Sequence, residues 1–163
     1  MSESLCPCGG ERSGHSSDRS YETCCQPLHL GLKSAETAEQ LMRSRYSAFA
    51  KLEIDYLVQT TAIGQQQDLD VDAIRQWAEA NQWQKLEVLQ HQPKVDNTHA
   101  LVEFKAYYHD GQQAQVHHEQ SYFVRYEQHW YFLDPTTEHT SSMKQPCLCG
   151  SGKKFKQCCA HFL

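Results

Sequence analysis

The sequence lacks any long apolar run, and its middle, from residue 26 to residue 146, contains no cysteine. A membrane-spanning helix needs about 20 consecutive apolar residues, so we expect no contact with a membrane. No apolar signal segment follows Met1 to Ser4, which predicts a cytoplasmic location where disulfides are disfavoured. No phosphate-binding glycine loop and no recognisable nucleophile is present either, so the pattern identifies no catalytic residue.

Positive charge is also scarce, because 15 Lys and Arg residues stand against 20 Asp and Glu residues, for a formal net charge of -5. General nucleic-acid binding is therefore not expected. The exception is a basic cluster near the C-terminus. It consists of Lys144, Lys153, Lys154 and Lys156.

The cysteines of this chain, eight in all, form two runs of the same kind near its two ends. The first run is Cys6, Cys8, Cys24 and Cys25, and the second is Cys147, Cys149, Cys158 and Cys159. Four thiolates are the ligand set of a closed structural zinc site. The sequence therefore predicts two zinc ions, each fixing a small knuckle that is too short to bury a core of its own.

Other interpretations of the cysteines stay open at this point. An iron-sulfur cluster also takes four cysteines, although the spacings match neither common ferredoxin pattern. Thiol redox chemistry is a further alternative. His15, His29 and His161 lie near the thiols and could each replace one ligand, or could be solvated loop residues.

The two runs are copies of one motif. Fifteen residues separate Cys8 from Cys24 and eight separate Cys149 from Cys158, yet each copy continues C-x-C-G and has an aromatic residue three positions before its C-C pair. Adjacent side chains of a strand point to opposite faces, so both cysteines of a C-C pair can bind one ion only from a turn or helical segment. We expect that turn at residues 153–159.

Residues 147–159 resemble the SEC-C motif, the zinc-binding tail also found on the preprotein translocase motor ATPase. With the looser N-terminal copy, whose gap is longer and Ser-rich, and with residues 41–49 between them, the whole chain resembles the YchJ-like family of bacterial proteins. The resemblance implies a central domain similar to nuclear transport factor 2 (NTF2) and assigns no activity.

The pattern between the knuckles predicts helices followed by strands, which is the α+β class. We expect an N-terminal knuckle in residues 1–31, a central domain in 32–136, and a linker with the C-terminal knuckle in 137–163. Helices are expected at 38–51, at 54–60 and after a cap at Asp68 or Asp70. Strands are expected at 84–90, 100–108, 114–126 and 129–133. The family resemblance implies that the helices pack in a curved antiparallel sheet, forming a cone with a pocket.

Arg45 falls inside the apolar stripe of the first helix, whereas Arg43 lies on its polar side with Ser47. A buried charge needs a partner, so Arg45 either forms a structural ion pair or recognises an anion at the pocket mouth. The candidate partners are Asp55, Glu103, Glu119 and Asp134. The residues expected to line the pocket are Arg45, Tyr46, Trp77, His118, Gln120 and Tyr122.

The sequence thus predicts a zinc-binding protein of the adaptor kind, which contacts a protein or ribonucleoprotein partner through its basic C-terminal knuckle. Phe162 and Leu163 are candidate hydrophobic contacts. A second hypothesis is a small-molecule binder or enzyme that holds a small anionic ligand in the central pocket. A third is a redox sensor whose thiolates release zinc on oxidation.

Overall fold

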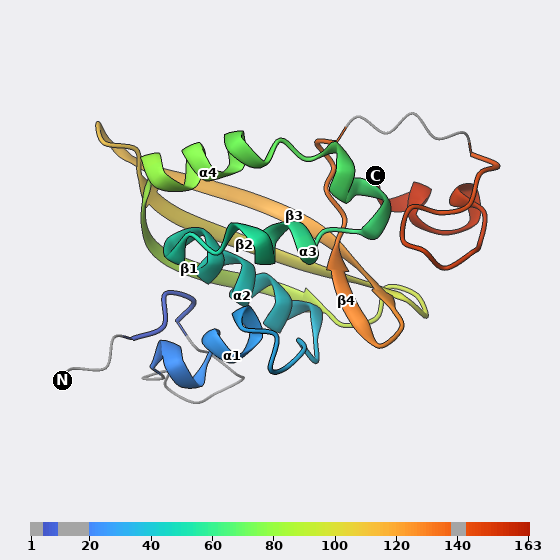
Figure 1. Cartoon of the computed structure of the whole chain (residues 1–163), viewed down its shortest axis with the longest axis horizontal. Coiled ribbons are helices and arrows are strands. Elements are labelled where there is room, and N and C mark those ends of the chain that lie inside the picture. Colours follow the sequence, from blue (N-terminus) through green and yellow to red (C-terminus); the bar gives the residue numbers. More distant parts are fainter. Residues whose placement is uncertain (1–4, 10–19, 138–142) are drawn as a thin grey trace.

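Four antiparallel strands form one curved sheet, and the central helices lie along one of its faces (Figure 1). The strands are β1 (Gln82–Gln92), β2 (His99–His109), β3 (Ala114–Tyr126) and β4 (His129–Phe132), and they are adjacent in chain order. Two register shifts interrupt the pairing of β1 with β2, and such irregularities increase the bend of a sheet. The computed structural model describes residues 5–9, 20–137 and 143–163.

Three helices follow the predicted pattern closely. They are α2 (Ala38–Lys51), α3 (Ile54–Gln59) and α4 (Val71–Ala80). The side chain of Thr37 accepts a hydrogen bond from the backbone N–H of Gln40 at 3.0 Å, and Asp70 caps α4 in the same way through Ala73. These caps satisfy N–H groups that a helix start leaves without an intrahelical partner. The predicted α+β class is confirmed.

The polar segment at residues 65–67 is part of the 3-10 helix η2 (Ile63–Asp68). Gln65 is only 1% exposed there. Its side chain donates to the carbonyl of Asp134 at 2.8 Å and accepts from the backbone N–H of Asp134 at 3.0 Å. The side chain of Gln65 thus makes the two hydrogen bonds to the backbone of Asp134 that a neighbouring strand would otherwise make.

The main core lies between α2 and the inner face of the sheet, with Leu41, Val102 and Phe123 each at most 1% exposed. The strand pairing places Val102 opposite Ser121 and Phe104 opposite Glu119. The odd-numbered residues of β3 therefore face the helices. This corrects the sequence prediction, which turned the even-numbered residues of β3 inward.

Short helical turns form the two terminal segments. The N-terminal knuckle contains η1 (Tyr21–Thr23) and α1 (Gln26–His29), and the C-terminal knuckle contains η3 (Phe155–Gln157) and η4 (Cys159–Phe162). The first packs against α2, and the second lies at the far end of the molecule, beyond α3 and β4 (Figure 1). Within the described ranges, no helix is long and apolar enough to cross a membrane.

Candidate metal centres and central cavity

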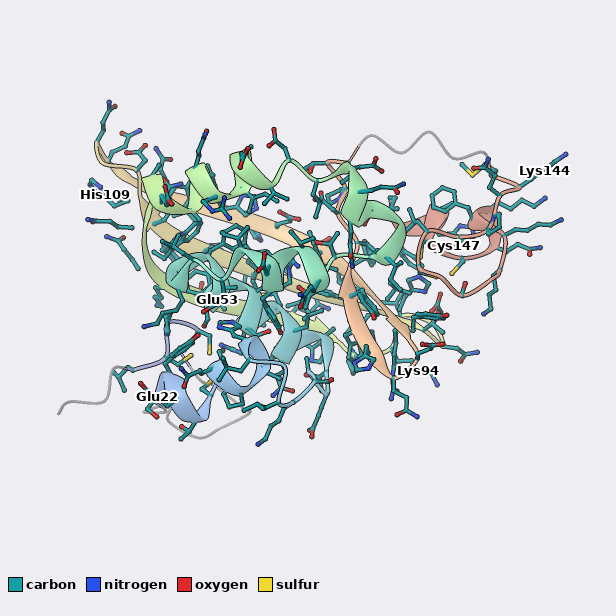
Figure 2. All side chains as sticks on the ribbon, in the orientation of Figure 1. Glu22, Glu53, Lys94, His109, Lys144 and Cys147 are labelled. Carbon is teal, nitrogen blue, oxygen red and sulfur yellow. The ribbon has the colours of Figure 1, made fainter. Side chains whose placement is uncertain are left out.

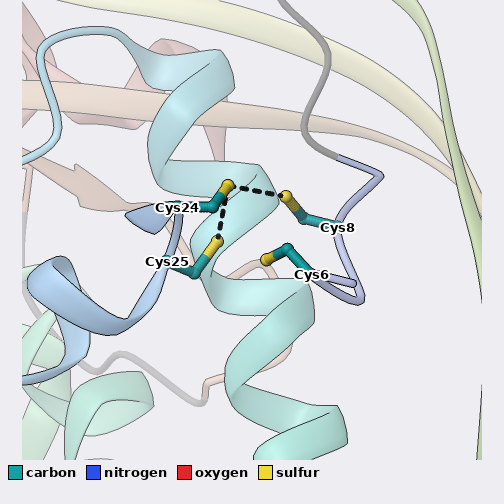
Figure 3. Close-up of side chains that lie close together, drawn as sticks. All are labelled: Cys6, Cys8, Cys24 and Cys25. Atoms are coloured by element: carbon teal, nitrogen blue, oxygen red, sulfur yellow. Dashed lines mark hydrogen bonds between the residues drawn. The ribbon is translucent and has the colours of Figure 1, made fainter. Parts of the chain in front are cut away.

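The fold brings each run of four cysteines to one point. In each set, all the ligand sulfur atoms lie within 4.8 Å of one another. Figure 3 shows the N-terminal set, in which Cys6 and Cys8 approach from one loop and Cys24 and Cys25 from the turn that faces it. Two short segments, 15 residues apart in the first set and 8 apart in the second, thus supply the cysteines of each set.

The sulfur spacing fits a single tetrahedral ion. Four thiolates at the usual Zn–S distance of about 2.3 Å stand about 3.8 Å apart along the edges of the tetrahedron. The Sγ–Sγ distances are 3.6 Å for Cys8–Cys24 and 3.9 Å for Cys24–Cys25. In the C-terminal set they are 3.7 Å for Cys149–Cys158 and 3.8 Å for Cys158–Cys159.

The same spacing argues against a disulfide and against an iron-sulfur cluster. The two sulfur atoms of a disulfide lie about 2.05 Å apart, far closer than any pair here. A cluster of several irons with inorganic sulfide between them would hold its cysteines further apart than one ion does. The residues therefore fit a mononuclear metal site at each end, with zinc as the ion that four thiolates most commonly bind.

The two sets repeat each other in backbone geometry as well as in sequence. The N–H of Gly9 donates to the carbonyl of Cys6, and that of Gly150 donates to Cys147, both at 3.1 Å. These glycines have φ values of 78° and 90°, which glycine adopts readily and other residues rarely. The 3-10 turns η1 and η3 begin with buried aromatic residues, Tyr21 and Phe155. The predicted turn before each C-C pair is therefore present.

The thiols of the C-terminal set lie so close together that their pKa values shift in opposite directions. Hydrogen bonds, chiefly from Cys147, lower the pKa of Cys149, while the same neighbour chiefly raises the pKa of Cys159. Burial is the main cause that raises the pKa of Cys158 to about 12. All four thiols can lose their protons together only if a cation offsets their charges, and a bound metal ion does this.

The N-terminal set is fastened to α2 on the side that the sequence suggested to be polar. Sγ of Cys6 lies 3.4 Å from the hydroxyl of Ser47, and Arg43 donates from Nη1 to the carbonyl of Cys8 at 2.9 Å. Ser47 is fully buried and Arg43 is only 8% exposed. The polar residues of this side are therefore covered by the N-terminal knuckle, which periodicity alone could not reveal.

His29 is a structural residue of this knuckle. Its Nε2–H donates to the carbonyl of Ser44 at 2.8 Å, and its Nδ1 accepts from the hydroxyl of Tyr21 at 2.6 Å. Burial lowers the pKa of His29, which agrees with a neutral ring. Because both nitrogens are engaged, His29 does not replace a thiol ligand. His15 lies outside the described residues, and His161 is exposed.

The C-terminal set is fastened to the outer face of the sheet through His99. This imidazole is 1% exposed, and its Nε2 lies 3.3 Å from Sγ of Cys159. Its Nδ1–H donates to the carboxylate of Asp96 at 2.8 Å. Residues that contact a metal ligand from outside orient that ligand and tune the affinity of the site. Nothing in the linear spacing relates His99 to Cys159, so the sequence did not identify it.

Packing completes this contact. The ring of Phe162 lies 4.3 Å from that of His99 and 4.9 Å from that of Tyr122, centroid to centroid. The backbone N–H of Gly64 donates to the carbonyl of Leu148 at 2.6 Å. Val124, on the same outer face, is fully buried. Phe162 therefore packs on the central domain, while Leu163 remains 45% exposed.

The outer face of β3 is apolar near Tyr122 and Val124 because the C-terminal knuckle covers it there. The sequence pattern therefore pointed to the outer face of β3 as the wall of the cavity, whereas the inner face forms it. His118 and Gln120 are exposed on the outer face, and His118 hydrogen-bonds the carboxylate of Glu103 at 2.8 Å. Tyr122 packs against the C-terminal knuckle. These three residues lie outside the cavity that they were predicted to line.

A cavity of about 160 Å³ lies between α2, α4 and the inner face of the sheet. We call it the central cavity. Arg45, Tyr46 and Trp77 line it, as the sequence predicts, and His117, Glu119 and Ser121 take the places expected of their neighbours on β3. The remaining lining residues are apolar: Met42, Phe49, Trp83, Phe104, Ala106, Phe123 and Phe132.

Arg45 lies in this cavity, but it does not form the structural ion pair that was one of its two predicted roles. Among the described residues no carboxylate forms a salt bridge with it. Its Nη1 donates instead to the carbonyl of Leu57 at 2.8 Å and to the hydroxyl of Thr60 at 2.7 Å. Burial lowers the pKa of Arg45 to about 10, so the group remains cationic at neutral pH.

Comparison with family models gives two matches. Residues 37–135 match the model of the YchJ middle domain, described as NTF2-like, and residues 143–160 match the SEC-C motif. Among curated proteins, a UPF0225 protein of Actinobacillus succinogenes is 45% identical over 159 residues, which is 98% of each chain. A UPF0225 protein of Geobacter sulfurreducens is 40% identical over 163 residues, covering 95% of this chain and 97% of the relative.

Two solved structures are similar to this one. The crystal structure of a SEC-C motif containing protein from Psychrobacter arcticus has a TM-score of 0.88 and 46% identity, and covers 98% of this chain and 97% of the other. The solution structure of a SEC-C motif containing protein from Rhodopseudomonas palustris has a TM-score of 0.67 and 37% identity. That match covers 72% of this chain and 91% of the other.

Proposed function

The chain belongs to the UPF0225 family, and we propose that it is a zinc-binding adaptor whose C-terminal knuckle presents a basic surface to an acidic protein or ribonucleoprotein partner. The coarser part of this assignment, two sets of four cysteines that could each hold a metal ion, is shown by the geometry. The metal, its structural role and the partner are the proposal.

The main observation in support of zinc is the sulfur spacing of 3.6 to 3.9 Å in the two sets. All the ligands are thiolates, and such a closed set suits a structural rather than a catalytic ion because no position is left open for water or substrate. Zinc sites of this type supply folding free energy to segments that have no adequate core. Such chemistry also suits a reducing compartment, and we propose the cytoplasm.

The adaptor role is supported by lysines that have no anionic partner. Lys144, Lys153, Lys154 and Lys156 are all exposed, and among the described residues none of them forms a salt bridge. Figure 2 shows Lys144 pointing away from the sheet at the far end of the molecule. On a chain of net charge -5, this is a local positive surface that attracts acidic groups.

Docking of the C-terminal knuckle on the sheet makes that surface rigid. Phe155, Cys158 and Cys159 are buried, and the exposed Lys153, Lys154 and Lys156 lie one or two positions from Phe155. A surface already held in its binding conformation loses less conformational entropy when a partner binds. The metal would thus act on binding indirectly, by fixing the shape of the knuckle.

The test combines metal analysis with partner capture. Protein purified under reducing conditions should contain two zinc ions per chain, corresponding to the two sets of cysteines. Tagged protein should capture a defined partner from cell extract, and the variant Lys153→Glu with Lys154→Glu should lose it while keeping both ions. Nuclease treatment of the extract distinguishes a ribonucleoprotein from a protein alone.

The matched control is Lys33→Glu with Lys94→Glu. These lysines are also exposed, lie outside the C-terminal knuckle, and give the same change in net charge. Loss of capture in both double variants would show a nonspecific charge effect and contradict the adaptor proposal. Absence of zinc from folded protein would contradict the metal assignment.

The redox-sensor hypothesis has less support from the site. Seven of the eight cysteines are buried, and Cys24 is the one that is partly exposed. Oxidation requires access to a thiolate, so buried ligands react slowly. Zinc release by mild peroxide at a rate well above that of inert structural sites would revive this hypothesis.

A further inference from the structure

The central cavity has the size and wall chemistry of a small-ligand site. Its volume of about 160 Å³ is similar to that of a buried apolar cavity, about 150 Å³, which is known to admit benzene in another protein. Aromatic residues from six elements form most of its wall, including Phe49 of α2, Trp77 of α4 and Phe104 of β2. A ligand that fills it must therefore be largely apolar and no larger than a substituted six-membered ring.

The polar part of the wall contains Arg45, a cation that forms no salt bridge within the described part of the chain. Arg45 donates three hydrogen bonds, all from Nη1 and all to uncharged acceptors: the carbonyl of Leu57 and the hydroxyls of Thr60 and Thr61. The described residues accept no hydrogen bond from its Nε or Nη2. The guanidinium carbon lies 4.5 Å from the centre of the Phe132 ring, which fixes the group without neutralising it.

Glu119, the carboxylate of the cavity wall, is already engaged by other groups. Its Oε2 pairs with Nε2 of His117, and its Oε1 accepts from the hydroxyl of Ser121 at 2.9 Å. The hydrogen bond from His117 is the main cause that lowers the pKa of Glu119 and raises that of His117. The hydrogen bonds of Glu119 among the described residues thus go to His117 and Ser121, and its charge acts on Arg45 without a direct contact, so the guanidinium can still pair with the anionic group of a ligand.

We propose that the central cavity binds a small carboxylic acid, with an apolar body about the size of a benzene ring and its carboxylate on Arg45. The planar guanidinium offers paired donors that match a carboxylate. A phosphate would bring a larger, more strongly hydrated charge into a mostly aromatic wall. A cationic ligand would be repelled by Arg45, although aromatic walls alone would accept one.

This site is separate from the proposed adaptor surface. All the residues that line the cavity belong to the central domain, between Met42 and Phe132, and none is a cysteine. Failure of ligand binding would therefore not contradict the zinc and partner proposals. Failure of those proposals would not contradict ligand binding in the cavity.

The experiment is an NMR titration with 4-methylbenzoate and, as its uncharged match, 4-methylbenzamide. The chain contains three tryptophans, of which Trp77 and Trp83 line the cavity and Trp130 does not. We expect saturable shifts of the indole N–H signals of Trp77 and Trp83, with that of Trp130 unchanged. The benzoate should bind about tenfold more tightly than the amide, because a hydrogen bond between two charged groups is stronger than one to a neutral acceptor.

Two variants make the test specific. Arg45→Gln should abolish the preference for benzoate over benzamide, whereas Arg125→Gln, at an exposed arginine outside the cavity, should retain it. Ala106→Leu should fill the cavity and abolish binding of both probes while Arg45 is kept, so the test survives if Arg45→Gln fails to fold. The proposal is overturned by equal affinity for the two probes, by binding that persists in Ala106→Leu, or by the absence of shifts at Trp77 and Trp83.

Discussion

The imidazole of His99 contacts Cys159 directly, with Nε2 of the histidine 3.3 Å from Sγ of the cysteine. Asp96 holds the other ring nitrogen, so a carboxylate, an imidazole and a ligand sulfur form one chain from the loop before β2 to the C-terminal knuckle. At the other end of the molecule, Ser47 makes the equivalent contact with Cys6 at 3.4 Å. In each cysteine set, at least one sulfur atom thus contacts a polar side chain of the central domain.

Replacing His99 should weaken the C-terminal site alone. In His99→Ala the Sγ of Cys159 loses its contact with Nε2, and residues that contact a metal ligand in this way typically contribute about 10 to 100-fold in metal affinity. We expect one of two zinc ions to pass more readily to a chelating dye. His118→Ala is the matched control, because His118 is exposed on the same sheet face. Equal zinc loss in both variants would contradict a specific role for His99.

Removing a ligand should loosen one knuckle at a time. Cys158→Ser should increase amide hydrogen exchange around His99 and Val124, because the C-terminal knuckle covers them. Cys24→Ser should instead increase exchange in α2 near Arg43 and Ser47. Hydrogen-exchange mass spectrometry distinguishes these patterns. Matching exchange profiles for the two variants would mean that the knuckles are not independent.

Gly64 should not tolerate a side chain. A Cβ built at this position would lie 2.8 Å from the backbone of Leu148, too close for any real contact. Gly64→Ala should therefore push the C-terminal knuckle off the sheet and lower stability by about 1 to 3 kcal/mol. Thermal unfolding of the zinc-loaded protein measures this change. Gln67→Ala, at an exposed position of the same 3-10 helix, should leave the melting temperature unchanged.

The His117–Glu119 pair predicts a pH dependence. The pKa of His117 is raised, chiefly by the hydrogen bond to Glu119, so its contribution to stability is complete below the unfolded pKa of about 6.5 and is lost as pH rises through the folded value. The pKa of Glu119 is lowered, so its contribution is present above the unfolded pKa of Glu and is lost as pH falls through the folded value. The pair therefore stabilises the fold most in mildly acidic solution.

Glu119→Gln should return the pKa of His117 toward its ordinary value, which NMR titration of the imidazole signals can measure. Glu103→Gln is the control because Glu103 pairs with His118 on the other face of the sheet. It should leave the titration of His117 unchanged. If both substitutions shift His117 equally, the effect is one of general charge and the pair has no special coupling.

Local signals in the sequence predicted much of this molecule. The apolar period predicted the helix that is found as α2 at Ala38–Lys51, and of the two predicted caps, Asp68 and Asp70, the structure has Asp70 at the start of α4. The cysteine spacing and the repeated C-x-C-G predicted which cysteines lie together in each set, because a metal site imposes its chemistry on residue type. Each of these features depends on residues that are close in sequence or chemically distinctive.

Features that depend on docking were not predictable in the same way. Arg43 and Ser47 are polar, and periodicity placed them in solvent, but the N-terminal knuckle covers them. His118 alternates with apolar residues on β3, yet those residues serve the C-terminal knuckle and not the central cavity. A hydrophobic pattern shows that a face is covered and does not show which segment covers it.

Helix α2 separates two sites. Arg43 and Ser47, one turn apart, contact the N-terminal knuckle, while Arg45 lies on the opposite side and lines the central cavity. A shift of this helix cannot change one side and leave the other as it was. By thermodynamic reciprocity, a cavity ligand that shifts α2 and so changes the metal affinity of the first cysteine set would have its own affinity changed by the metal through the same factor.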